Sequence, residues 1–136
     1  MSRFLVVSGA VLFLIGLFQG LAVDLVVNPR MALSAHLTAV QSGIAIMVAG
    51  AVAGLSALST RWHSVMRWLV VVGMYTLWFG ITMASLIGAS EALPIAGEGH
   101  TASATGESVV KSLIVIGSIA TIAGWGMFVL GLLRKT

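Results

Sequence analysis

The sequence contains no cysteine and very few charged residues. Of its 136 residues, none is Cys and only 8% are Asp, Glu, Lys or Arg. The missing thiols exclude disulfides, thiolate metal sites and cysteine nucleophiles. A soluble domain carries about a quarter charged residues, so this small share, beside 59% hydrophobic residues, indicates that lipid is the solvent. The sequence also lacks GxGxxG, P-loop, GxSxG and HExxH motifs, which argues against the corresponding nucleotide and hydrolase sites.

Four apolar runs are each long enough to cross a bilayer as a helix, which takes about 20 residues. They cover residues 4–27, 32–58, 65–87 and 109–133. Strands are excluded because an open sheet would leave backbone groups unpaired in lipid. We therefore predict an all-α polytopic membrane protein, a single antiparallel four-transmembrane-helix bundle over residues 1–136. The long connection 88–108 is expected either to cap one end of the bundle or to form an ordinary surface loop.

The positive residues are gathered at one end of this expected bundle. With four spans, both termini share a side with the 59–64 turn, and most Lys and Arg lie on that side. The positive-inside rule then predicts cytoplasmic termini in an inner or plasma membrane. The chain has seven Lys and Arg against four acids. In a membrane protein this positive surplus reflects orientation in the bilayer, so no nucleic-acid partner is predicted. The acids Asp24, Glu91, Glu98 and Glu107 fall at the opposite end.

Glycines recur near one face of three spans and predict close helix packing. Such stripes let helix backbones approach closely, within one chain or between subunits. A four-helix unit of this size has little interior, so self-association into a homo-oligomer is expected. The stripes are Gly9, Gly16 and Gly20; Gly43, Gly50 and Gly54; and Gly117, Gly124 and Gly131.

His36 is the strongest candidate for chemistry, because an intramembrane ionisable residue is a functional-site hypothesis by default. Imidazole is the commonest metal ligand and a proton carrier near neutral pH, and on a bundle helix it can hold haem iron from one side. An interfacial histidine that reaches out to water is an equal alternative at this depth. A site that combines His36 with His100 and Glu98 is a further alternative, although no HxxxH or ExxH pair supports a multi-ligand metal site.

The other polar residues of the spans are candidates for a substrate pocket or for contacts between helices. Tyr75 can donate a proton or hydrogen bond to a substrate, or bond a neighbouring helix. Asp24 and Arg30 flank a turn and can pair across it, with Asn28 before Pro29 as the corner residue. The remaining pocket candidates are Gln19, Gln41, Ser42, Thr76 and Trp78. They could share one cavity if the rotation of each helix turns them toward the same space.

Three motifs carry a resemblance to a known family: NPRMALSAHL at the start of the second span, LPIAGEGH in the long connection, and GESVV after it. Together with the size and the four spans, they make the chain resemble the hydroxylaminobenzene mutase family over nearly its whole length. This resemblance implies an isomerase that acts on a small aromatic hydroxylamine. It would convert hydroxylaminobenzene to 2-aminophenol by moving the hydroxyl group from nitrogen to the ortho carbon.

A more distant similarity links the Ala35-His36 pair to styrene oxide isomerase. It implies haem b bound through His36, ferric iron as a Lewis acid on the N–O group, and a trimer with haem at the subunit interfaces. The chain departs from that pattern where Asn, Asp and Tyr are expected, at Ser42, Thr76 and Ala84. Tyr75 is the candidate stand-in, and the other candidate catalytic groups are Ser42, Gln41 and Thr76.

Two other classes of function stay open at this stage. A haem-bearing electron-transfer protein would usually need two histidines in its spans, and here only His36 lies in one. A non-catalytic transporter or accessory membrane subunit is the second class. The first span carries no Glu of the kind that a small proton-coupled drug exporter uses, which weakens the transporter reading.

Overall fold

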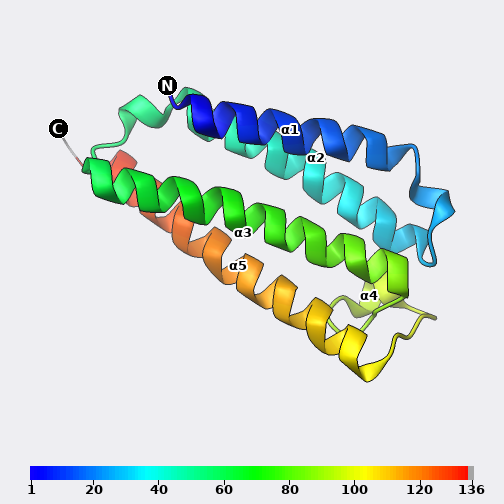
Figure 1. The fold of residues 1–136 in the computed structure, drawn as a ribbon. Helices are drawn as coiled ribbons and strands as arrows, with labels where there is room; N and C mark the ends of the chain where they lie inside the picture. Colours follow the sequence, from blue (N-terminus) through cyan, green and yellow to red (C-terminus); the bar gives the residue numbers. More distant parts are fainter. Residues whose placement is uncertain (135–136) are drawn as a thin grey trace.

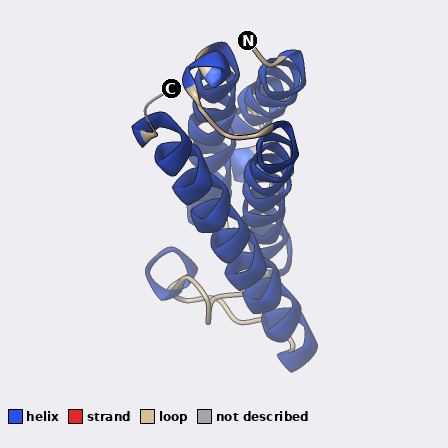
Figure 2. Cartoon of the chain, turned by 90° about the vertical axis from the view of Figure 1, so that its left-hand side faces the viewer, coloured by secondary structure: helices blue, strands red, loops and turns tan. Residues whose placement is uncertain are grey.

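Four long antiparallel helices make up most of the computed structural model, which describes residues 1–134 (Figure 1). They are α1 (Arg3–Gly20), α2 (Pro29–Ala51), α3 (Thr60–Ile87) and α5 (Ala104–Leu133), with a short α4 (Pro94–Gly97) and two 3₁₀ turns between them. Each long helix is long and apolar enough to cross a membrane. The predicted all-α fold with four spans is confirmed, and residues 1–134 contain no strand (Figure 2).

The helix bounds differ from the predicted spans mainly around the first connection. The first helix ends at Gly20, short of the expected residue 27, and the second covers 29–51 in place of 32–58. Hydropathy cannot mark this end, because the connection itself is apolar: Leu21 and Leu25 are 85% and 83% exposed. The fourth long helix begins at Ala104, so the long connection is shorter than predicted.

The helices form two hairpins, and the bundle is more open than a closed four-helix arrangement. α1 packs along α2, α5 packs along α3, and α2 joins the hairpins by packing on α3. α1 meets α3 only briefly, and α5 has no other extensively packed neighbour in the described chain. Figure 1 shows the same pairing, with α1 and α2 on one side and α3 and α5 on the other. Much of α5 is therefore left facing the surroundings.

The glycine stripes bring the backbones of each hairpin together, as predicted. A Cβ on Gly9 would lie 2.5 Å from the Gly43 carbonyl oxygen, and one on Gly117 would lie 2.6 Å from the Leu77 nitrogen. Both are closer than a Cβ can approach, so a larger residue would push the helices apart. Gly54 is an exception, since the nearest atom to its Cβ position is 3.8 Å away.

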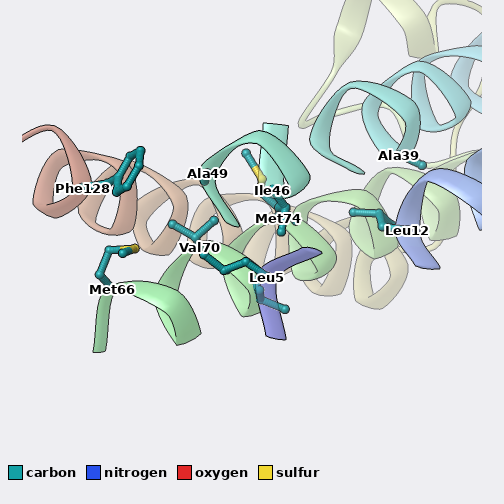
Figure 3. Packing of buried hydrophobic residues seen from close by; sticks show 10 residues of the cluster. Leu5, Leu12, Ala39, Ile46, Ala49, Met66, Val70, Met74 and Phe128 are labelled. Carbon is teal, nitrogen blue, oxygen red and sulfur yellow. The ribbon is translucent and has the colours of Figure 1, made fainter. Parts of the chain in front are cut away.

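The main core lies between α2 and α3 and extends toward α1 and α5. Because α2 packs on α1 within its own hairpin and on α3 of the other, it has many buried residues, among them Ala39, Ile46 and Ala49. A second, smaller core lies at the α4 end and includes Met31, Ile81 and Val110. The labelled side chains of the main core (Figure 3) are Leu5, Leu12, Ala39, Ile46, Ala49, Met66, Val70, Met74 and Phe128.

A single buried carboxylate fastens the long connection to the end of the bundle. Glu107, 5% exposed, accepts hydrogen bonds from the backbone N–H groups of Ser90 (3.0 and 3.1 Å), Glu91 (3.0 Å) and Ala102 (3.1 Å). Asn28 Nδ2 adds a bond of 2.8 Å to the Ala96 carbonyl oxygen. The connection therefore forms a cap over this end of the helices.

Candidate functional site

The His36 imidazole rests against the last turn of α1. Its Nδ1 lies 2.7 Å from the Gly16 carbonyl oxygen. A carbonyl oxygen can only accept, so Nδ1 carries the proton and donates, and the lone pair of the neutral ring lies on Nε2. The ring occupies the space over Gly20, where a Cβ would lie 2.8 Å from Cε1 and 2.9 Å from Nδ1. α1 thus supplies both the acceptor and the room for this ring.

The Nε2 atom of His36 is left available for a ligand. It has no hydrogen bond within residues 1–134, and it is not among the buried polar atoms that lack a partner. A histidine that binds a metal usually donates its other ring N–H to a carbonyl or carboxylate, which fixes the tautomer. The His36 donor set therefore fits an axial haem ligand.

The alternative site that combines His36, His100 and Glu98 is wrong. In the described part of the chain no three His, Asp or Glu side chains gather as metal ligands. The His100 ring nitrogens lie 3.2 Å from the Glu98 carbonyl oxygen and 3.1 Å from the Val27 carbonyl oxygen. The Glu98 carboxylate lies 3.5 Å from Arg30 Nη1. These groups belong to the cap, while His36 faces α1.

A polar network joins α1 to α3 beside the His36 contact. Trp78 Nε1 donates to Gln19 Oε1 at 2.8 Å, and Gln19 Nε2 donates to Thr82 Oγ1 at 3.1 Å. The Thr82 hydroxyl in turn donates to the Trp78 carbonyl oxygen at 2.9 Å. Gln19 is thus bonded to α3, while its chain neighbour Gly20 receives His36 from α2. The last turn of α1 therefore contacts predicted polar residues from two helices, His36 of α2 and Trp78 of α3.

Tyr75 bonds a neighbouring helix, which was the structural alternative for this residue. Its hydroxyl donates to the Ser8 carbonyl oxygen of α1 at 2.8 Å. Its ring meets the edge of Trp78 with centroids 6.3 Å apart. Together with Thr76, these two residues line a shallow groove of about 290 Å³ between α3 and α5.

The expected common cavity for the polar residues does not form. Gln41 is exposed on the outer face of α2, Asp24 is exposed in the first connection, and Ser42 is buried at 9% exposure. A cavity of about 600 Å³ lies between α2, α3 and the cap, and Arg30 is the single member of the predicted set in its lining. The candidates are separated because positions along one helix point in different directions.

The predicted corner at the start of α2 is confirmed, but its ion pair is different. Asn28 is fully buried, and its Oδ1 accepts the Met31 N–H at 3.1 Å, so that Asn28 caps α2. Its own N–H donates to the Ser85 carbonyl oxygen at 3.0 Å. Arg30 pairs with Glu98 in the cap and not with Asp24.

Gly16 and Gly20 were missed as parts of the site. The glycines were recognised only as packing positions, since their meeting with His36 depends on how α1 and α2 align. One signal was available: two small residues one turn apart on the first helix, beside Gln19, leave room for a ring from the next helix.

Four membrane-length helices and one histidine held on a helix interface define a small polytopic membrane protein with a single-histidine site. The chain matches the family model described as styrene oxide isomerase over residues 1–133, and it belongs to this family. It is 36% identical over 135 residues to hydroxylaminobenzene mutase HabA of Ectopseudomonas oleovorans, covering 98% of this chain and 100% of that one.

Hydroxylaminobenzene mutase HabB of the same organism is 30% identical over 133 residues, covering 93% of this chain and 81% of the relative. No solved structure matches the chain. The family and these two relatives identify the chain as an isomerase. The resemblance stated from the sequence motifs is confirmed.

Proposed function

We propose that this isomerase converts hydroxylaminobenzene, or a close arylhydroxylamine, to the corresponding 2-aminophenol. Similarity to two named mutases along almost the whole chain supports this substrate. In the reaction the N–O bond breaks and a C–O bond forms at the ortho carbon. The ortho carbon loses a proton and the nitrogen gains one, so substrate and product have the same atoms and no electron acceptor is needed.

The geometry of His36 is the observation that carries the mechanism. Its Nε2 would hold the iron of haem b, because the Nδ1 proton is committed to the Gly16 carbonyl oxygen. Bound there, ferric haem would supply a Lewis acid for the N–O group of the substrate. Gly16 keeps the imidazole in the tautomer that ligation requires, and Gly20 leaves the ring its space.

The remaining polar groups near this end of α1 position the helices and offer hydrogen bonds to a substrate. Gln19 bonds Trp78 and Thr82 of α3, and so fixes α3 relative to the end of α1 on which the His36 ring lies. The Tyr75 hydroxyl is committed to the Ser8 carbonyl oxygen as a donor and keeps its acceptor capacity. We assign Tyr75 and Thr76, which face the α3–α5 groove, a supporting role and not proton transfer.

A homo-oligomer would complete the site. His36 is only half-buried in the single chain, and its Nε2 is not among the buried atoms, so a planar cofactor there would need cover from lipid or from a second copy. The exposed Gln41 amide on the outer face of α2 supports a second copy, because a polar side chain facing lipid is unfavourable. We propose a trimer, as the resemblance to styrene oxide isomerase implies, and we place it in an inner or plasma membrane with cytoplasmic termini, as the positive-inside rule predicts.

Replacing His36 by alanine tests this function directly. We expect purified wild-type protein to show a haem Soret band and to form 2-aminophenol from hydroxylaminobenzene. The variant should lose both, because the other two histidines, His63 and His100, lie at the start of α3 and in the cap, with ring nitrogens against backbone carbonyl oxygens. His100→Ala is the matched control, since His100 lies in the cap on the Val27 carbonyl oxygen, and it should keep the band and the activity.

Three results would contradict the proposal. A wild-type protein without a Soret band, or an unchanged band and rate in His36→Ala, would remove haem ligation by His36. A reducible spectrum of iron held by two histidines would favour electron transfer. The structure gives no support to that class, because the third histidine, His63, lies at the far end of α3 with Nε2 3.3 Å from the Ser56 carbonyl oxygen.

A further inference from the structure

A second polar pocket lies at the end of the bundle that carries the termini, far from His36. It has a volume of about 340 Å³ and is closed by the start of α1, the 3₁₀ turn after α2 and the first turns of α3. Ala53 and Leu58 form apolar walls, and the polar lining comes from Ser2, Thr60, His63 and Arg67.

Two polar groups of this pocket lack a partner. Arg67 Nε and Ser2 Oγ are buried, and neither has a hydrogen bond within residues 1–134. A buried polar group without a partner costs about 1–3 kcal/mol, and more when the group is charged. Two neighbouring carbonyl oxygens at the end of α2 accept backbone N–H groups: Gly50 accepts from Ser2, and Val48 accepts from Val52. No acceptor of the described chain bonds Arg67 Nε, and Ser2 Oγ is likewise without a partner.

The charge around the pocket is also uncompensated. All four acids of the chain lie at the opposite end: Asp24 after α1, Glu91 and Glu98 in the cap, and Glu107 at the start of α5. The ion pair of the described residues, Arg30 with Glu98, is at that opposite end too. The end that carries the pocket holds positive residues without a side-chain carboxylate, namely Arg3, Arg61, Arg67 and Arg134.

Tryptophans next to the lining residues indicate where the pocket would lie in a membrane. Trp62 and Trp68 flank it on α3 with 52% and 57% of their surfaces exposed. Tryptophan prefers the headgroup level of a bilayer, and basic pockets between helices at this level bind acidic lipid headgroups. His63, whose Nε2 is 3.3 Å from the Ser56 carbonyl oxygen, keeps its ring at the wall of the pocket.

We propose that this pocket is a phosphate-binding site, occupied in the membrane by the headgroup of an acidic phospholipid. Phosphate oxygens supply the acceptors that the guanidinium of Arg67 and the hydroxyl of Ser2 lack, and an arginine fork matches a phosphate in geometry. The lipid would hold the start of α1 to the start of α3. The site is independent of the isomerase reaction, so neither proposal depends on the other.

The test measures thermal unfolding of the full chain in nanodiscs of phosphatidylcholine, with and without phosphatidylglycerol. We expect phosphatidylglycerol to raise the unfolding midpoint and Arg67→Gln to weaken its apparent affinity about tenfold or more, the value of a charged hydrogen bond. Arg61→Gln is the matched control, because it makes the same charge change on an exposed residue outside the pocket. It should keep most of the stabilisation.

Inorganic phosphate, added to the protein in neutral detergent, separates the two sources of the ligand. Stabilisation by phosphatidylglycerol alone supports a lipid headgroup, and equal stabilisation by inorganic phosphate supports the phosphate site with a free anion. If Arg67→Gln and Arg61→Gln lose the same amount of stabilisation by phosphatidylglycerol, the specific site is overturned, because general surface charge then explains the effect. If Arg67→Gln does not fold, native mass spectrometry of the wild type decides: retention of phosphatidylcholine as strong as that of phosphatidylglycerol overturns the proposal.

Discussion

Replacing Gly20 by alanine should disable the His36 site while the protein stays folded. The added methyl group would lie 2.8 Å from Cε1 and 2.9 Å from Nδ1 of His36, so the ring has to turn away. It then loses its bond to the Gly16 carbonyl oxygen, which fixes the tautomer. Loss of a group that orients a metal ligand commonly costs about 10–100-fold in affinity or activity. We expect a loss of that size in haem content and in 2-aminophenol formation.

Gly126→Ala is the control for this substitution. Gly126 lies within α5, and no atom is found within 4 Å of its Cβ position, so the same methyl group meets nothing. Its activity and Soret band should match those of the wild type, with equal or slightly higher stability because alanine favours helix. A wild-type spectrum and rate in Gly20→Ala would show that α1 does not position His36.

The parts of the site that were predicted correctly depend on local sequence. Asn28 followed by Pro29 predicts a capped corner, because an N-cap side chain and a proline in the first turn act within a few residues. The same locality makes the four spans predictable, since backbone groups in lipid must be satisfied within the helix. Both features are present in the structure.

The parts that were missed depend on the alignment of separate helices. His36 was identified as the key residue, but its position on Gly16 and Gly20 requires the register of α1 against α2. The same is true of Gln19, which bonds Trp78 and Thr82 across to α3. Hydropathy along one helix carries no information on this register, so whether the polar residues share one cavity stayed open at the level of sequence, and the structure shows that they do not.

Glu107 shows a third kind of limit, in which a residue type suggests the wrong environment. A glutamate just before an apolar span is expected at the water interface, yet Glu107 is 5% exposed. Its surroundings consist of backbone N–H groups from residues 90, 91 and 102, which no side-chain pattern reveals. The carboxylate takes the place of the water that would otherwise satisfy these donors.

Replacing Glu107 by glutamine should release the cap and destabilise the fold. The new amide nitrogen is a donor facing N–H groups of Ser90, Glu91 or Ala102, so at least one buried donor is left without an acceptor and the charge is lost. Each such group costs about 1–3 kcal/mol, and we expect a total loss of about 3 kcal/mol in unfolding free energy. The cap should also open locally before the helices unfold.

Limited proteolysis and thermal unfolding in detergent would separate the two effects. In Glu107→Gln, cleavage within residues 88–103 should become fast at temperatures where the helices remain intact. Glu98→Gln is the matched control in the same connection, because the Glu98 side chain is 78% exposed and its ion pair with Arg30 is at the surface. Such pairs contribute about 0–1 kcal/mol, so the control should resist cleavage. Equal protection in both variants would mean that the Asn28 bond to Ala96 holds the cap without Glu107.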